Sequence, residues 1–320
     1  MQPPEPASIA PSPPTLCVLI PCLNEAQAIR AVVAEYRAVF PWARILVVDN
    51  GSDDDTAGEA QAAGAAVVHE RIRGKGRAFL KGLSLVREDL LLLVDGDGTY
   101  PAEGGRALLE VWNATGADLI TGVRRSTSNG GTEFRPLHQT GTQMFGKALG
   151  LLFGVRQRDV FSGLRLLSRR FYRNLPVLSR GFELEMEMTA QAIDKGFTLG
   201  EAEVPYRERV AGTQSKLRTF RDGARILRML LQLARDYKPL FFFGSHAVLF
   251  AAAGLAAGTP PVLGYLQTGL VGRLPLAVLA ASLMNLALFC LLTGVMLESG
   301  LRAQREAFQI RARREDEVPR

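Results

Sequence analysis

Residues 90–101 read Leu-Leu-Leu-Leu-Val-Asp-Gly-Asp-Gly-Thr-Tyr-Pro, an apolar run that ends in two aspartates separated by one glycine. A short apolar run of this kind is typical of a buried strand. Alternate residues of an extended chain project to the same side, so we expect the carboxylates of Asp95 and Asp97 to lie together. Such a pair suits Mg²⁺ or Mn²⁺, which prefer oxygen ligands and complete their shells with substrate phosphates.

Short apolar runs and helical stretches alternate over residues 15–122. The predicted strands are Leu16–Ile20, Ile45–Val48, Ala65–His69, Leu90–Val94 and Leu119–Gly122. The predicted helices are Ala26–Phe40, Thr56–Ala63, Gly76–Val86 and Ala102–Ala114. This alternation predicts an α/β fold with a mostly parallel sheet and helices on both faces. In such sheets ligands bind beyond the carboxyl ends of the strands.

Polar residues follow two other predicted strands as well. Residues 21–25 (Pro-Cys-Leu-Asn-Glu) come after the first strand, and residues 49–56 (Asp-Asn-Gly-Ser-Asp-Asp-Asp-Thr) come after the second. One such cluster is usually a turn or a helix cap, and Asp54 or Asp55 could simply cap the helix that begins near Thr56. Three polar clusters at three strand ends favour a shared site.

Two long stretches near the C-terminus, Phe241–Gly272 and Leu274–Leu297, contain no Asp, Glu, Lys or Arg. A bilayer core needs about 20 apolar helical residues. We therefore predict two transmembrane helices within residues 239–298, near Phe241–Leu263 and Pro275–Leu297. The predicted connecting loop carries Pro260, Pro261, Gly264 and Gly269. A buried helical hairpin of a soluble domain is the alternative.

The charges that flank these stretches predict their orientation. Arg235 and Lys238 precede the first span, five arginines lie within residues 302–314, and only Arg273 lies between the spans. The positive-inside rule then puts the N-terminal α/β domain and both termini, including a basic tail over residues 299–320, on the cytoplasmic side of the membrane. Residues 1–14 have the composition of a Pro-rich disordered leader, not of a signal peptide. The three cysteines show no metal or redox spacing, as expected in a reducing compartment.

The net charge of the chain is concentrated in one segment. The 320 residues include 38 Lys and Arg and 32 Asp and Glu, a net charge of +6. Residues 207–238 contain nine basic and three acidic side chains, which accounts for the whole excess. Residues 219–238 read as an amphipathic interfacial helix on anionic membrane lipids. Nucleic acid is the competing partner for such charge, but no nucleic-acid motif accompanies it, so none is predicted.

The motifs together resemble those of a known enzyme family. Pro21–Glu25, Asp49–Thr56, Gly74-Lys75-Gly76 and Asp95–Pro101 are similar to successive motifs of family 2 glycosyltransferases of the GT-A fold. Asp159–Ser168 and Arg209–Leu217 resemble the polyprenyl-phosphate sugar synthase branch, the dolichyl-phosphate mannose synthase group. The resemblance implies a Rossmann-like GT-A domain over residues 15–218, a nucleotide-sugar donor and an inverting reaction.

The resemblance also implies roles for single residues. Pro21, Leu23, Glu25 and Asp49 would line the nucleotide base and ribose. Asp95 and Asp97 would hold the metal and the donor diphosphate, Gly96 would allow close backbone approach, and Lys75 would reach the diphosphate. Thr99 stands where relatives often have Gln, which leaves a third protein ligand open. Glu183, Glu185 and Glu187 either reflect the charge preference of a helix N-terminus or contact donor sugar hydroxyls.

The acceptor decides which catalytic groups are needed. A sugar hydroxyl needs a general base, whereas a lipid monophosphate is already an oxyanion near neutral pH, since its second pKa is about 6. It needs a cationic clamp instead, and Arg suits bidentate phosphate contacts. The candidate clamp residues are Arg124, Arg165, Arg209 and Lys216.

The resemblance, together with these residues, implies a membrane-anchored, metal-dependent transferase. It would move a hexose from a UDP- or GDP-linked sugar to a polyprenyl phosphate at the cytoplasmic face of the membrane. One alternative is transfer to a lipid hydroxyl such as that of a diacylglycerol, with Asp159 as the base. The other is a non-catalytic membrane protein that binds nucleotide-sugars.

Overall fold

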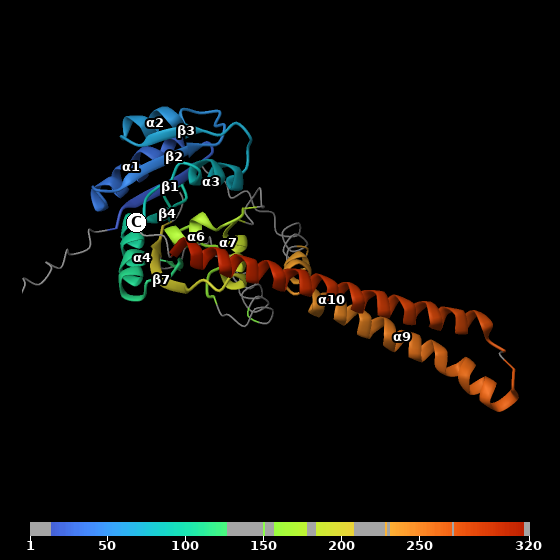
Figure 1. Cartoon of the computed structure of the whole chain (residues 1–320). Coiled ribbons are helices and arrows are strands. Elements are labelled where there is room, and N and C mark those ends of the chain that lie inside the picture. Colours follow the sequence, from blue (N-terminus) through green and yellow to red (C-terminus); the bar gives the residue numbers. More distant parts are fainter. Residues whose placement is uncertain are drawn as a thin grey trace, which may run out of the picture. The chain divides into compact units, whose positions relative to one another are not determined.

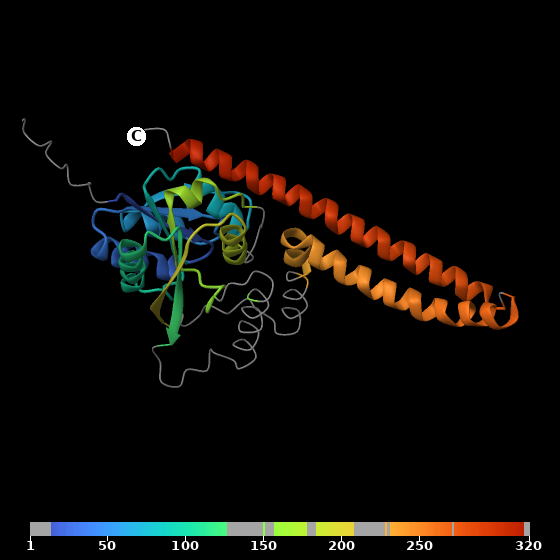
Figure 2. The same ribbon diagram turned by 60° about the horizontal axis from the view of Figure 1, so that its bottom comes forward.

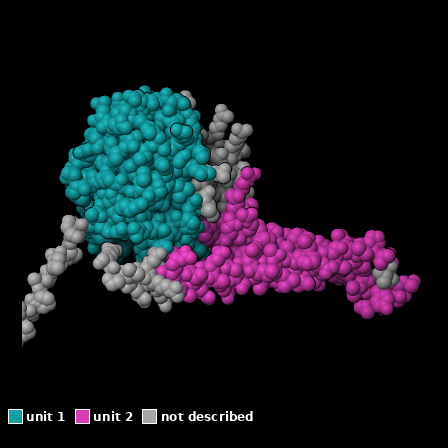
Figure 3. All heavy atoms as spheres, turned by 45° about the horizontal axis from the view of Figure 1, so that its top comes forward, with its two compact units in different colours: residues 1–146, 155–216 teal, residues 147–154, 217–320 magenta. Residues whose placement is uncertain are grey.

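The computed structural model describes residues 14–126, 150, 157–177, 184–207, 228, 231–270 and 272–316. The chain divides into two compact units (Figure 3). One comprises residues 1–146 and 155–216, close to the predicted catalytic domain, and the other comprises residues 147–154 and 217–320. The predicted leader, apart from Pro14, and most of the predicted interfacial helix lie outside the described residues.

The first unit contains a seven-stranded sheet with the strand order β3-β2-β1-β4-β6-β5-β7 (Figure 1). The strands are β1 (Leu16–Cys22), β2 (Arg44–Asp49), β3 (Ala66–His69), β4 (Leu90–Leu93), β5 (Leu119–Ser126), β6 (Arg165–Ser168) and β7 (Leu199–Tyr206). The strands β1 to β4 pair in parallel, as do β5 and β7, and only β6 runs antiparallel to its neighbours β4 and β5. The predicted mostly parallel α/β sheet is confirmed.

Helices cover both faces of this sheet. The helices in the described part of this unit are α1 (Ala26–Val39), α2 (Thr56–Ala62), α3 (Lys75–Leu83), α4 (Ala102–Thr115), α6 (Arg169–Arg173) and α7 (Leu184–Asp194). Val18 and Ile20 of β1 share a buried core with Ile29 of α1. Leu19 points to the opposite face, where α3 lies so close that a Cβ on Gly82 would come within 2.3 Å of the Leu19 side chain.

The strand order reverses between β1 and β4. From β1 the chain adds β2 and β3 on one side and then places β4 on the other side of β1. Ligands of open α/β sheets bind at such a reversal, beyond the carboxyl ends of the strands. Gly96 follows β4 at this point, and a Cβ there would lie 2.4 Å from the Cys22 sulfur at the end of β1. Glycine is therefore required for the two strand ends to approach this closely.

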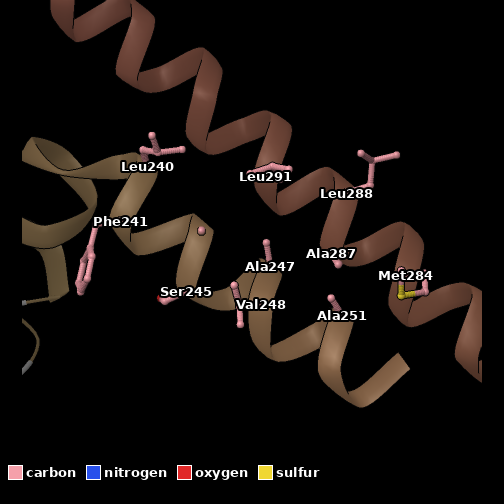
Figure 4. Close-up of a pocket in the computed structure, with 11 residues that line it drawn as sticks. Leu240, Phe241, Ser245, Ala247, Val248, Ala251, Met284, Ala287, Leu288 and Leu291 are labelled. Atoms are coloured by element: carbon pink, nitrogen blue, oxygen red, sulfur yellow. The ribbon is translucent and has the colours of Figure 1, made fainter. Parts of the chain in front are cut away.

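The second unit contains two long helices, α9 (Pro239–Thr268) and α10 (Leu274–Asp316), which lie side by side in both ribbon views (Figures 1 and 2). Both are long and apolar enough to cross a membrane. At 1.5 Å per residue they measure about 45 and 65 Å, so each exceeds the bilayer core of about 30 Å. Small side chains at Ala247 and Ala287 lie between the helices at an apolar groove (Figure 4).

Two features of this unit differ from the sequence prediction. The predicted loop at Pro260 and Pro261 is wrong, because α9 continues through both prolines and ends at Gly269, which has a left-handed φ of 67°. Each proline removes one N–H donor from the helix, yet α9 runs unbroken from Pro239 to Thr268. Residues 299–316 of the predicted tail continue α10 as a helix.

Part of the predicted interfacial helix is visible. Residues 231–237 are helical, Leu233 and Ala234 are buried, and Arg235 is exposed. Tyr237 accepts a hydrogen bond through its carbonyl from the Arg305 guanidinium of α10 at 3.3 Å. Of residues 219–230 only Arg228 is described, so the amphipathic character of that stretch stays a prediction.

Candidate active site

The loops after β1 and β2 are locked together at the carboxyl edge of the sheet. Asn24, with a left-handed φ of 57°, accepts a hydrogen bond through its side-chain oxygen from the Asp53 N–H at 2.8 Å. The Asn24 N–H donates to the Ser52 hydroxyl at 3.0 Å, and the Glu25 N–H donates to the Thr56 hydroxyl at 2.9 Å. The first two polar clusters predicted from the sequence therefore form one surface.

The predicted nucleotide-binding residues belong to this surface. Asp49 is buried at the end of β2, where its carboxylate accepts from the Ser52 N–H at 3.1 Å and lies 3.0 Å from Nδ1 of His69. Pro21, Leu23 and Glu25 are half-buried in or just after β1. These contacts fix the Asp49 carboxylate beside a partly open surface that could accept a flat ligand.

Asn50 connects the end of β2 to the segment before α3. Its buried amide donates to the carbonyls of Glu70 and Ile72 at 3.2 and 2.8 Å, and its oxygen accepts from the Gly74 N–H at 2.6 Å. Three bonds from one side chain thus fix residues 70–74. Because Gly74 immediately precedes α3, these bonds determine where Lys75 begins the helix.

Lys75 lies between two carboxylates. Its ammonium nitrogen is 2.5 Å from Oδ1 of Asp95, after β4, and 2.5 Å from Oε1 of Glu185, on α7. Burial by itself lowers the pKa of Lys75, but the charges of the two carboxylates that it contacts outweigh this effect, so the pKa lies above its ordinary value. Lys75 is therefore held as a cation inside the site.

Asp97 is buried two residues beyond Asp95. Its Oδ1 accepts from both the backbone N–H and the hydroxyl of Thr99, at 3.1 and 2.7 Å. Thr99 therefore orients the carboxylate. Among the described residues no group of three His, Cys, Asp or Glu side chains is arranged to hold a metal. The sequence prediction takes the chain as extended through Asp97, but β4 ends at Leu93 and residues 96 and 97 form a turn. Asp95 and Asp97 remain the proposed ligands of a cation such as Mg²⁺, which commonly takes one or two carboxylates and fills its shell with water and phosphate oxygens.

Arg165 is wholly buried at the start of β6. Its guanidinium donates to the carbonyls of Ser162 and Val160 at 3.0 and 2.5 Å and to the hydroxyl of Thr189 on α7 at 2.9 Å. Burial lowers its pKa to about 10, against the opposing charges of Glu185 and other nearby groups. Arg165 was predicted as a clamp for the acceptor phosphate, but here it holds the 160–165 turn against α7 and exposes no surface.

Arg124 and Asp159 form a bidentate ion pair. The guanidinium donates from Nε to Oδ2 at 2.7 Å and from an Nη to Oδ1 at 2.9 Å. It also lies 5.4 Å from the centre of the Tyr206 ring. Burial by itself lowers the pKa of Arg124. The effects of nearby Tyr100 and of the bonds to Asp159 are opposite and larger, so the pKa lies above its ordinary value. Both oxygens of Asp159 are thus engaged by one cation.

Tyr100 links the strand-end loop to the turn before β6. Its hydroxyl accepts from the Gly163 N–H at 2.9 Å and lies 3.3 Å from the Ser162 hydroxyl. Burial raises the pKa of Tyr100. Gly163 also faces Asp95, because a Cβ on it would lie 2.0 Å from Oδ2 of that carboxylate. The turn that Arg165 holds therefore reaches the predicted metal-binding aspartate.

The structure brings several of the predicted site residues together at one edge of the sheet. The structure brings Lys75 to Asp95, with Gly96 and Asp97 directly after it, and groups Pro21, Leu23, Glu25 and Asp49 at the same edge of the sheet. Arg209, Lys216 and Glu183 lie outside the described residues.

Two roles at the site were not predicted from the sequence. They belong to Glu185, which pairs with Lys75, and to Asn50, which anchors the loop before Lys75. The signal for Glu185 was its place among apolar residues in Leu-Glu-Met-Glu-Met, where a surface carboxylate is not expected.

Known proteins resemble this chain in sequence and in fold. Glycosyltransferase AglJ of Haloferax volcanii is 33% identical over 246 residues, which cover 77% of this chain and 80% of the relative. The dolichyl-phosphate hexose transferase of the same organism is 28% identical over 222 residues, 69% of this chain and 94% of the relative. Glucosyl-3-phosphoglycerate synthase from Mycobacterium tuberculosis, solved with Mn²⁺ and UDP-glucose, shares the fold with a TM-score of 0.56 at 21% identity, over 69% of this chain and 78% of that one. Residues 17–175 match the profile described as glycosyl transferase family 2, and the chain belongs to that family.

Proposed function

We propose that this glycosyltransferase moves a hexose from a UDP- or GDP-linked sugar to a polyprenyl phosphate at the cytoplasmic face of a membrane. The observation that carries the proposal is the bidentate pair of Arg124 and Asp159. A hydroxyl acceptor would need Asp159 to take its proton, and this role is disfavoured because both oxygens of that carboxylate already accept hydrogen bonds from the Arg124 guanidinium. A phosphate acceptor needs no base, because it is already ionised near neutral pH.

Two further observations support a lipid acceptor. The two C-terminal helices are long and apolar enough to cross a membrane, which would keep the enzyme where polyprenyl lipids are found. A relative that aligns over 94% of its own length is named a dolichyl-phosphate hexose transferase. The basic residues of 207–238 would then contact anionic lipids, and the arginines after residue 301 would keep that end of α10 cytoplasmic.

The donor would bind at the strand reversal. Pro21, Leu23, Glu25 and Asp49 would line the base and ribose, and Asp95 and Asp97 would hold Mg²⁺ or Mn²⁺. The bound cation would neutralise charge on the diphosphate leaving group. Lys75 begins α3, whose first N–H groups have no acceptor within the helix, so its ammonium and these donors could bind phosphate oxygens together.

The reaction is then a single displacement. An oxygen of the lipid phosphate forms a bond to the anomeric carbon as the bond from that carbon to the diphosphate oxygen breaks. The nucleoside diphosphate leaves with the electron pair, and the configuration at the anomeric carbon inverts. Arg209 and Lys216 remain the proposed clamp for the acceptor phosphate. Of the other two predicted clamp residues, Arg124 is paired with Asp159, and Arg165 would act by positioning the 160–165 turn.

The lipid product tests this proposal. Purified full-length protein in detergent is incubated with Mg²⁺ or Mn²⁺, radiolabelled UDP- or GDP-hexoses, and either a polyprenyl phosphate or a diacylglycerol. An acid-labile sugar-phosphate lipid supports the proposal, and an acid-stable glycolipid formed from diacylglycerol overturns it. Nucleotide-sugar binding without transfer to any lipid would support the non-catalytic alternative.

The pH dependence should follow the acceptor. We expect kcat/KM for the lipid phosphate to fall about tenfold per pH unit below pH 6 and to level off above pH 7, since the dianion is the nucleophile and its pKa is about 6. Initial rates between pH 5 and pH 9 at saturating donor measure this profile. A rate limited by a protein base of different pKa would move the inflection away from the pKa of the free lipid phosphate.

Gly163 should be intolerant of even one added methyl group. In Gly163→Ala the new Cβ would overlap the Asp95 carboxylate and displace it from Lys75. We expect transfer to fall about 10- to 100-fold, because small displacements of positioning groups have effects of that size. Gly300→Ala is the matched control, since a Cβ at Gly300 in α10 meets no atom within 4 Å. Equal activity of the two variants would contradict the prediction.

A further inference from the structure

The ammonium of Lys75 is bound to the carboxylate that the metal would use. Lys75 Nζ lies 2.5 Å from Asp95 Oδ1, and the same nitrogen lies 2.5 Å from Glu185 Oε1. The three side chains come from the start of α3, the loop after β4 and the first turn of α7. The side chains are only partly exposed: 16% for Lys75, 27% for Asp95 and 4% for Glu185. Water therefore screens these charges weakly.

A divalent cation and an ammonium ion cannot both contact Asp95 closely without strong repulsion. A Mg²⁺ or Mn²⁺ ion bound to Asp95 Oδ1 at about 2.0–2.2 Å would lie within contact distance of the Lys75 nitrogen, which is 2.5 Å from that same oxygen. A cation bound to Oδ2 would be farther away but would still repel the ammonium in this weakly screened site. This repulsion favours an arrangement in which Lys75 has moved away from Asp95 when the cation binds. Glu185 remains a carboxylate partner for the Lys75 ammonium when that ammonium leaves Asp95.

The donor diphosphate would give the displaced ammonium a new partner. Lys75 is the first residue of α3, and the N–H groups of that first turn have no acceptor within the helix. A diphosphate at this helix end would meet both the ammonium and the N–H groups. The cation and the diphosphate would thus favour the same arrangement of Lys75, the one in which it has left Asp95.

We infer that Lys75 couples metal binding to donor binding by competing with the divalent cation for Asp95. The inference rests on the proposed function, since it takes Asp95 as a metal ligand and a nucleotide-sugar as the donor. Before the donor arrives, Lys75 neutralises Asp95 and the cation binds weakly. Because coupling between two ligands is reciprocal, bound cation strengthens diphosphate binding by the same factor. Lys75 is a positioning residue in this step, and Glu185 retains it.

Replacing Lys75 with methionine should have two effects of opposite sign. Lys75→Met has a similar chain length and no charge, so Asp95 loses its competitor. We expect Mn²⁺ alone to bind the variant at least about tenfold more tightly than the wild type, since one close unit charge near a protein surface contributes that much or more. UDP and GDP, measured without metal, should bind at least about tenfold more weakly, because a cation that would contact the diphosphate is missing.

The measurements need no catalytic turnover. The free Mn²⁺ signal in electron paramagnetic resonance gives Mn²⁺ affinity, and isothermal titration calorimetry gives UDP and GDP affinity, both with full-length protein in one detergent. Lys81→Met is the matched control, since Lys81 is exposed on the same helix. It should leave both affinities near the wild-type values. A retained melting temperature of Lys75→Met would show that the variant is folded.

The outcomes separate this inference from the proposed function. Unchanged or weaker Mn²⁺ binding to folded Lys75→Met overturns the inference, and the proposed function stands if the wild type still glycosylates polyprenyl phosphate. Opposite shifts in the Mn²⁺ and nucleotide affinities support the inference even if the acceptor is another lipid. If Lys75→Met does not fold, Lys75→Gln, which keeps a polar group for Glu185, replaces it. This variant should likewise bind Mn²⁺ more tightly and UDP and GDP more weakly than the wild type.

Discussion

Asp97→Asn should lower the rate of sugar transfer about 100- to 1,000-fold if Asp97 holds the proposed metal, because a cation that neutralises a leaving group contributes several kcal/mol to catalysis. The substitution is nearly isosteric. Asp97 Oδ1 accepts from the N–H and the hydroxyl of Thr99, and an asparagine oxygen can accept both bonds. The fold should therefore survive while the negative charge is lost. Initial rates with radiolabelled donor at saturating Mn²⁺ and polyprenyl phosphate measure the effect.

A surface carboxylate provides the control for this experiment. Glu59 on α2 pairs with the exposed guanidinium of Arg30, and exposed pairs of this kind contribute about 0–1 kcal/mol to stability. Glu59→Gln makes the same change from carboxylate to amide and should keep the wild-type rate. If Asp97→Asn also kept that rate, Asp97 would have no part in binding the cation and the Asp95–Asp97 assignment would be wrong.

The strand ends of the site could be predicted because each part is local in the sequence. The strands β1, β2 and β4 are short apolar runs, each followed at once by polar residues, and parallel pairing brings their carboxyl ends to one edge. Asp49, Asp95 and Asp97 could be assigned to that edge from this pattern alone. The order reversal that opens the site also follows from a known rule of α/β sheets.

The contacts between distant segments could not be predicted in this way. β6 has only four residues and begins with Arg165, yet it is inserted between β4 and β5, where Leu91 pairs with Leu167. Glu185 pairs with Lys75 across 110 positions of sequence. No local pattern marks either pairing, because each depends on which segments tertiary packing brings together. Pro260 and Pro261 show the opposite kind of error. Two adjacent prolines are a strong local signal for a loop, yet α9 continues through both of them.

Arg165→Met should destabilise the catalytic unit by at least about 3 kcal/mol, because it removes three buried hydrogen bonds made by a charged group. The guanidinium has no exposed surface, and methionine would leave the Ser162 and Val160 carbonyls without this donor. For a unit of this size the loss corresponds to a fall in apparent melting temperature of about 10 °C. Tryptophan fluorescence reports on this unit, since both tryptophans of the chain, Trp42 and Trp112, lie in it.

Arg158→Met separates this structural role from a general effect of losing an arginine. Arg158 lies seven positions earlier, is 55% exposed, and pairs with Glu201 and Glu203 on the surface. Its loss should change stability by at most about 1 kcal/mol. If Arg165→Met instead melted with the wild type and still lost transfer, Arg165 would have to contact substrate, as a phosphate clamp would. A large fall in melting temperature, with wild-type melting of Arg158→Met, would assign Arg165 to holding the 160–165 turn, and through Gly163 to positioning Asp95.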